Sequence, residues 1–112
     1  MNSSKKGTNV EFINEKKVII LTARVHPGET VASFKIHGLI NFLISNDPQA
    51  MLLRDKFIFH VIPMLNPDGV INGNYRTSLS GQDLNRCWGN PSQKIHPTIW
   101  HAKRLIKTMG YT

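Results

Sequence analysis

The chain has 112 residues, 40% of them hydrophobic, and a formal net charge of +7, as expected for a globular protein that forms one small domain or part of a larger one. No apolar run is long enough to span a membrane, residues 1–7 lack the apolar segment of a signal peptide, and a single cysteine, Cys87, excludes an internal disulfide. We therefore expect an intracellular protein with no membrane partner.

The first predicted strand follows a polar start. Residues 1–9 indicate a disordered lead-in, because they are polar and show no periodicity. A short strand is predicted at residues 10–13. After a polar turn at residues 14–17, the apolar residues 18–22 predict a buried strand.

A long helix is predicted at residues 29–45, where apolar side chains recur at helical spacing on nearly every side. A helix of this kind packs against more than one neighbour. Gly38 in its middle is less favourable than alanine by about 1 kcal/mol, so we expect another backbone to approach closely there. His37 beside it indicates a packed or rim residue rather than a ligand.

A second helix and a second strand follow. Asp47 suits the N-cap and Pro48 the first helical position, which predicts a short helix ending near Asp55. Residues 57–62 are rich in β-branched and aromatic side chains and predict a central strand, because both faces are apolar. His60 within it indicates a packed histidine.

The stretch 66–93 predicts a long loop, since it opens with a turn signal at residues 66–69 and shows little periodicity. Loops of this length are functional or disordered. The side chains it carries favour a functional loop: Tyr75, Arg76, Asp83, Asn85, Arg86 and Trp88. Pro97 then opens a helix with one apolar face, and Gly110 suits its end.

The order strand, helix, helix, strand, long loop, helix predicts an α/β fold with helices on both faces of a sheet. Two or three strands cannot cover two such apolar helices, so apolar faces would stay open. We therefore expect residues 10–112 to be a piece of a larger domain.

His26 and Glu29 lie where the first strand passes into the long helix, at the carboxyl end of the strand. Ligands bind at this edge in open α/β sheets. An imidazole and a carboxylate three residues apart can ligate one zinc ion, and Pro27 with Gly28 allows the bend that aligns them. The spacing alone recurs by chance, so without other motifs it favours a capped helix start.

Basic residues dominate the end of the chain. No carboxylate follows Asp83, whereas five lysines and arginines do. This imbalance favours an acidic peptide, nucleic acid or an anionic membrane surface as partner. An equally weighted alternative is a solvated helix face whose compensating acids lie elsewhere in a longer chain.

Four segments, in one order, resemble the zinc carboxypeptidases. They are RVHPGET at 24–30, PMLNPDGV at 63–70, GNYR at 73–76 and DLNR at 83–86. The chain is similar to the cytosolic carboxypeptidase branch, whose members trim glutamates from tubulin and other acidic tails. The resemblance implies an α/β/α sandwich with a mixed sheet, of which this chain would be a truncated N-terminal part.

The resemblance also implies roles for single residues. His26 and Glu29 would be the first two ligands of one zinc ion. Arg76 would stabilise the oxyanion, and Asn85 with Arg86 would grip the terminal carboxylate of the substrate. The family's third zinc ligand and its glutamate base have no match here, because His60, His96 and His101 are poorly placed substitutes. The 112-residue chain alone is therefore expected to be inactive.

This resemblance predicts a zinc metallocarboxypeptidase that removes C-terminal or branch glutamates in the cytoplasm, in association with the cytoskeleton. The expected partners are acidic peptide tails, above all those of tubulin, and neither nucleic acid nor membrane. Two alternatives stay open: a zinc deacylase of small N-acyl amino acids, and a non-enzymatic basic module that binds acidic tails or nucleic acid through the C-terminal helix. Arg76 with Asn85 and Arg86 favours a peptide substrate over the first alternative.

Overall fold

The computed structural model describes residues 16–110. In chain order the elements are β1 (Lys17–Thr22), α2 (Val31–Leu43), α3 (Pro48–Lys56), β2 (Phe57–Ile62), α4 (Pro67–Asn72), the 3-10 helix η1 (Leu84–Arg86) and α5 (Pro97–Thr108). The strands predicted at 18–22 and 57–62 and the three longer helices are confirmed within a few residues. Within residues 16–110, however, neither strand is fully buried and β2 is not central, because the sheet has two strands. The predictions for residues 1–9 and 10–13 lie outside the described part of the chain.

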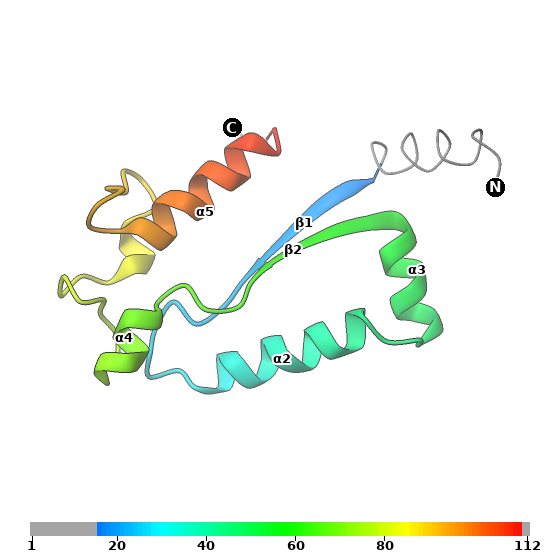
Figure 1. Cartoon of the computed structure of the whole chain (residues 1–112), viewed down its shortest axis with the longest axis horizontal. Helices are drawn as coiled ribbons and strands as arrows, with labels where there is room; N and C mark the ends of the chain where they lie inside the picture. Colours follow the sequence, from blue (N-terminus) through cyan, green and yellow to red (C-terminus); the bar gives the residue numbers. More distant parts are fainter. Residues whose placement is uncertain (1–15, 111–112) are drawn as a thin grey trace.

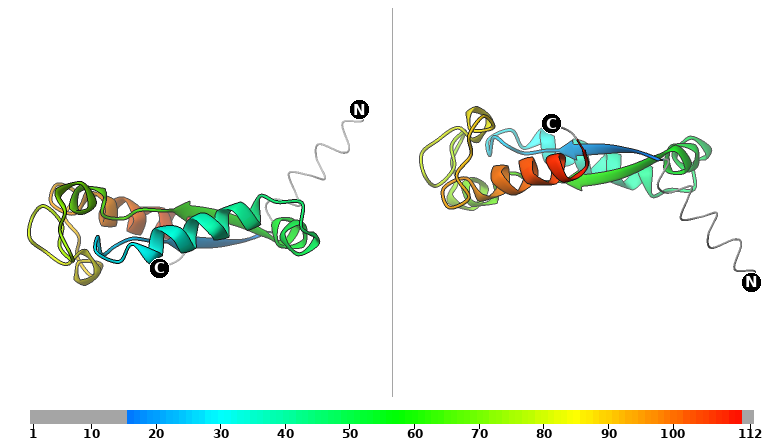
Figure 2. Two further views of the ribbon diagram at one scale, coloured as in Figure 1. Left: turned by 90° about the horizontal axis from the view of Figure 1, so that it is seen from below. Right: turned by 90° about the horizontal axis from the view of Figure 1, so that it is seen from above.

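The two strands lie between α2 and α5. β1 and β2 pair in parallel, with Lys17 opposite Phe57 and Thr22 opposite Ile62. Figure 1 shows α2 along one side of the strands and α5 on the other, and the two opposite views in Figure 2 place α2 and α5 on opposite faces. The α/β fold is therefore confirmed, although the sheet within residues 16–110 is two-stranded and parallel rather than mixed.

Helix α2 is covered on one face only. Its buried residues are Ile36 and Leu43, whereas Phe34 is 77% exposed and Ile44 is 69% exposed. The prediction of burial against several neighbours is therefore wrong for residues 16–110, because no described element packs on the outer face. The close approach expected at Gly38 is also wrong for the described residues, since none of their atoms outside the backbone of α2 itself lies within 4 Å of a Cβ placed there.

Helix α3 begins as predicted and is tied to the end of α2. The Asp47 side chain accepts a hydrogen bond from Gln49 N at 2.8 Å, and Pro48 occupies the first turn. Arg54 Nη1 donates to the carbonyls of Leu43 and Ser45 at 2.6 and 2.8 Å. Because these carbonyls lie at and just after the end of α2, the arginine fixes the direction in which the chain turns from α2 into α3.

The stretch 66–93 is not a plain loop, because it contains α4 and η1. Asn66 caps α4 by accepting a hydrogen bond from Gly69 N at 2.9 Å, Pro67 is its first residue, and Gly73 ends it with a φ of +77°. The Asn-Pro-Asp sequence suits a turn and a helix start equally well, and six residues are too few to show helical periodicity.

A small core lies beyond the carboxyl ends of the strands. Leu65, Leu84, Ile99 and Ala102 are buried together, with Val25, Ile62 and Trp88 packed against them. The predicted apolar face of α5 supplies Ile99 and Ala102, and Gly110 follows the helix with a φ of +90°. This core holds α5 and the segment around η1 against the end of the sheet. No helix in the described residues is long and apolar enough to cross a membrane.

The core predicts a large effect for one truncation. Ile99 is fully buried, so Ile99→Ala should lower the free energy of unfolding by roughly 2 to 5 kcal/mol through lost burial and the cavity left behind. Urea unfolding followed by tryptophan fluorescence would measure this loss. The matched change at the 51% exposed Ile95 should stay within about 0.5 kcal/mol of the parent, and equal losses at the two positions would contradict the core.

Candidate metal and substrate site

The turn after β1 is held by the side chain of Arg24. The strand ladder continues briefly past β1, since Ala23 N donates to Ile62 O at 3.0 Å. Arg24 then adopts a φ of +55°, which is uncommon for a residue with a side chain. Its guanidinium donates twice to Pro27 O, at 3.0 and 2.8 Å, and once to Ser33 Oγ at 2.6 Å. These bonds stabilise the turn that presents His26 and lead the chain into α2.

The buried side chain of Asn66, in the segment that follows β2, stabilises the same turn. It is 1% exposed, and its Nδ2 donates to Val25 O at 3.2 Å and to Thr77 O at 3.3 Å. The side-chain amide therefore joins the turn before His26 to the segment that follows α4. Since both groups of this amide are bonded, its burial carries no unsatisfied polar atom.

Gly28 is needed for close packing. A Cβ on Gly28 would lie 2.4 Å from Tyr75 Cδ2, and Gly28 N donates to Tyr75 O at 2.7 Å. The bend predicted at Pro27 and Gly28 is present as a turn. The φ of Gly28 is not in the left-handed region, so the close packing, rather than the bend, is what requires a glycine here. The missing side chain lets the segment carrying Arg76 lie directly against the turn carrying His26.

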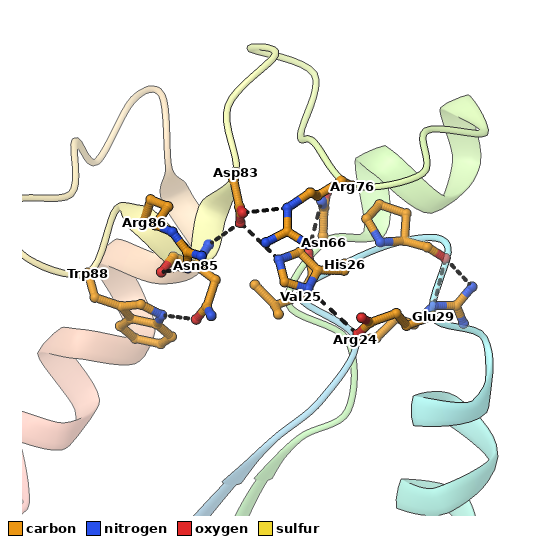
Figure 3. Close-up of polar contacts among 11 residues, drawn as sticks. Arg24, Val25, His26, Glu29, Asn66, Arg76, Asp83, Asn85, Arg86 and Trp88 are labelled. Carbon is orange, nitrogen blue, oxygen red and sulfur yellow. Dashed lines mark hydrogen bonds and ion pairs between the residues drawn. The ribbon is translucent and has the colours of Figure 1, made fainter.

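Asp83 joins the predicted catalytic and metal-binding residues. Its Oδ1 lies 2.9 Å from His26 Nε2 and accepts the backbone N–H of Asn85 at 2.9 Å, while its Oδ2 accepts Arg76 Nε at 2.8 Å (Figure 3). Desolvation alone would raise the pKa of Asp83, but the hydrogen bonds from His26 and Asn85 and the charge of Arg76 outweigh it and lower this pKa. The carboxylate is therefore ionised at neutral pH.

The bond to Asp83 fixes which nitrogen of His26 can bind a metal. An ionised carboxylate only accepts, so His26 Nε2 carries a proton and donates it, which leaves Nδ1 as the nitrogen whose lone pair a metal ion could take. Nδ1 faces Glu29 Oε2 at 3.6 Å. Tetrahedral zinc with bonds of about 2.0 to 2.2 Å needs neighbouring ligand atoms about 3.4 Å apart, so this donor pair fits the ion.

The described residues supply two metal donors rather than three. No group of three His, Cys, Asp or Glu side chains within residues 16–110 is arranged to hold an ion. His96 is engaged elsewhere, because its Nδ1 accepts from Ser92 N at 3.0 Å and its Nε2 bonds to Gln82 Oε1. His60 lies within β2, and the ring of His101 packs against Trp100 with centroids 4.8 Å apart. None of the three completes a metal-binding group with the pair within residues 16–110.

Trp88 orients the side chain of Asn85. The indole Nε1 can only donate, and it lies 3.1 Å from Asn85 Oδ1 (Figure 3). The amide oxygen of Asn85 therefore faces the indole, and the NH₂ group is left to donate to another acceptor. Arg86 is exposed on η1, and its Nη1 bonds to Asn85 O at 3.5 Å. Both side chains are thus open to an incoming carboxylate.

A cavity of about 400 Å³ extends from Glu29 to Asn85, and His26 is not among its lining residues. Glu29 and Asn85 both line it, and the side chain of Glu29 is 61% exposed. Its other lining residues come from the end of β1 and the turn, the inner face of α2 and the small core: Leu21, Thr22, Ala23, Arg24, Val25, Ala32, Lys35, Ile36, Leu39, Leu65 and Trp88. The arrangement suits a ligand that reaches the carboxylate of Glu29 and the amide of Asn85 together.

The structure gathers most of the predicted site residues. His26 and Glu29 lie together, Arg76 is joined to them through Asp83, and Asn85 and Arg86 follow directly on η1. Sequence reasoning gave no role to Asp83 or Trp88. The position of Asp83 in the DLNR segment was a signal, but its pairing with His26 spans 57 residues and depends on the fold.

Relatives were found by three comparisons, beginning with family models. The model described as zinc carboxypeptidase matches residues 3–106. Cytosolic carboxypeptidase 1 of Danio rerio is 52% identical over 112 residues, which cover 100% of this chain and 10% of that protein. The human protein of that name is 60% identical over 110 residues, which cover 98% of this chain and 9% of that protein. The chain thus spans about a tenth of the length of these curated relatives.

Solved structures agree with these matches. A metallo-carboxypeptidase from Burkholderia cenocepacia aligns with a TM-score of 0.81 at 37% identity, over 86% of this chain and 27% of that one. A second match is a metallo-carboxypeptidase from Pseudomonas aeruginosa, solved in complex with (2-guanidinoethylmercapto)succinic acid. It aligns with a TM-score of 0.81 at 36% identity, over 88% of this chain and 26% of that one. The family match includes all five residues predicted for the site, and the chain belongs to the zinc carboxypeptidase family.

Proposed function

We propose that this chain forms part of a zinc metallocarboxypeptidase that removes C-terminal or branch glutamates from acidic protein tails such as those of tubulin. The observation that carries the proposal is the Asp83 cluster, which joins the imidazole of His26 to the guanidinium of Arg76 with Glu29 alongside. Such a cluster places metal donors and a fixed positive charge around one point, as hydrolysis of a peptide bond requires.

In this proposal, His26 and Glu29 hold the zinc ion through Nδ1 and the carboxylate. A zinc ion there would polarise the scissile carbonyl and activate a water molecule. Asp83 keeps the imidazole in the tautomer and orientation that metal binding needs, a task for which carboxylates commonly partner histidine ligands. Its second oxygen holds Arg76 Nε, which leaves the terminal nitrogens of that arginine to face an oxyanion.

Asn85 and Arg86 are proposed to bind the terminal carboxylate of the peptide. The NH₂ group of Asn85 is directed away from Trp88 by the indole bond, and the guanidinium of Arg86 can bind a carboxylate through two parallel hydrogen bonds. Both residues follow Asp83 directly, so the group that orients His26 also sets their position. A carboxylate held here distinguishes a chain end from an internal peptide bond.

The preference for acidic tails is proposed from the charge of the chain, and the location from the names of its relatives. The chain carries +7, and no carboxylate follows Asp83, so its surface favours anionic peptides. The relatives reported above are named cytosolic carboxypeptidases, which supports a cytoplasmic location for this protein as well. Association with the cytoskeleton would follow if tubulin is the substrate.

The 112-residue chain by itself is proposed to be inactive. A catalytic zinc site uses three protein ligands and a water molecule, and residues 16–110 bring only His26 and Glu29 together. Two donors should bind zinc weakly and leave the nucleophilic water unorganised. Activity therefore has to be tested in a protein that supplies the other ligand.

A chimera tests the proposed reaction. The segment of human cytosolic carboxypeptidase 1 that matches this chain is replaced by it, and release of glutamate from a glutamate-ended peptide is measured. We expect release, and Arg76→Ala should lower kcat by about 10²- to 10³-fold through loss of oxyanion stabilisation. Lys56→Ala, which removes an exposed charge at the end of α3, is the matched control and should leave kcat unchanged.

Two results of the chimera experiment would count against the proposal. One is the absence of glutamate release from a chimera that holds one zinc per chain. The other is faster hydrolysis of small N-acyl amino acids than of peptides, which would support the deacylase instead.

Zinc titration of the 112-residue chain tests the metal pair without any reaction. We expect weak binding that His26→Ala abolishes and that Asp83→Asn weakens by about 10- to 100-fold, because the partner of a ligating histidine sets its orientation. Competition with a chelating dye would measure both affinities. His101→Ala is the control, and a His26→Ala chain that binds zinc as well as the parent would refute the assignment.

A further inference from the structure

A basic groove lies between α5 and the segment that leads into it. It has a volume of about 240 Å³ and is lined by Asn90, Pro91, Trp100, Lys103, Arg104 and Lys107. Three of these side chains are cationic and none is acidic. The nearest carboxylate before it in the sequence, Asp83, is already bonded to His26 and Arg76.

Contacts within the chain hold two of the three cations in place. Lys103 Nζ donates to Trp88 O and to Gly89 O, at 2.7 Å each. The guanidinium carbon of Arg104 lies 5.3 Å from the ring centroid of Trp100, a cation–π contact, and the side chain is exposed. Lys107 is exposed in the last turn of α5. The positions of two of the three positive charges are therefore fixed by contacts within the chain.

We propose that this groove binds a carboxylate-rich peptide segment, separately from the residues that would bind a terminal carboxylate. Arg104 can take a side-chain carboxylate through its planar fork, and Lys107 can act as a point charge beside it. The inference rests on the proposed function only for the source of this peptide, an acidic tail. Carboxylate side chains are small enough for a groove of this size, and the ring of Trp100 offers apolar surface for their methylene groups.

A peptide fits this groove better than nucleic acid. Single-stranded nucleic acid stacks its bases on open aromatic side chains. Among residues 16–110, Trp100 is the one aromatic side chain that lines the groove, and its ring is in contact with Arg104 and with the edge-on ring of His101. Within that range, no second aromatic ring lines the groove to continue a stack.

The groove and the candidate substrate residues lie on one continuous segment. Trp88 holds Asn85 Oδ1 through its indole N–H, and its backbone carbonyl is held by Lys103 from α5. Two residues later, Asn90 and Pro91 form the wall of the groove. An acidic tail in the groove would therefore be anchored on the same segment that presents Asn85.

Fluorescence anisotropy with a labelled glutamate-rich peptide tests the groove on the full 112-residue chain. The peptide carries a C-terminal amide, so it offers no terminal carboxylate to Asn85 and Arg86. We expect binding that weakens as salt is added and that falls by about two- to fivefold in each of Arg104→Gln and Lys107→Gln, as for exposed ion pairs. Both side chains are exposed, and circular dichroism should show unchanged folding.

Three controls give the outcomes that would overturn the proposal. Lys56→Gln removes an equal charge from α3 and should bind like the parent, so an equal loss there would show a non-specific charge effect. A glutamine peptide of the same length should not bind, and tighter binding of a single-stranded oligonucleotide of equal charge would make the groove a nucleic-acid surface. The anisotropy measurement needs neither zinc binding nor hydrolysis. Its result would therefore still hold if the proposed reaction were not observed.

Discussion

The carboxylate of Asp83 receives hydrogen bonds from the ring of His26, the guanidinium of Arg76 and the backbone of Asn85. These three groups come from the turn after β1, the segment after α4 and η1, and no other described side chain contacts all three. Without this carboxylate, the imidazole could rotate about its side-chain bonds, and Arg76 would lose its positioning partner. The site is therefore a consequence of packing η1 against the turn, which the small core around Leu84 and Ile99 secures.

Much of the fold follows from local signals. The apolar runs give β1 and β2, and residues whose chemistry suits helix ends, such as Asp47 with Pro48, give the boundaries of α3. Helix α4 was not predicted, because the residues at its start suit a turn as well as a helix N-terminus. Helix α2 is less buried than its sequence predicts for another reason. Periodicity shows which side chains prefer an apolar environment, but whether they are covered depends on neighbouring elements, which residues 16–110 do not provide on the outer face.

The candidate site also combines features that the sequence predicts with features that only the fold reveals. The spacing of His26 and Glu29 at the edge of a strand is compatible with a metal pair but equally typical of a helix start. Their role as ligands, like the roles of Arg76, Asn85 and Arg86, needed the family resemblance. The partnership of Asp83 with His26 required the fold, because the two residues are 57 positions apart. The function of Gly28 likewise became visible only with Tyr75 in place, since a glycine in a sequence does not say whether it serves a bend or a close contact.

The hydrogen bonds of Arg24 and Asn66 belong to the protein and not to a ligand. The conformational entropy of the turn is therefore lost during folding, before any ion arrives. If His26 and Glu29 bind zinc as proposed, capture of the ion would then order little beyond the exposed carboxylate of Glu29. Preorganisation of this kind makes affinity depend on the number of donors rather than on the plasticity of the loop.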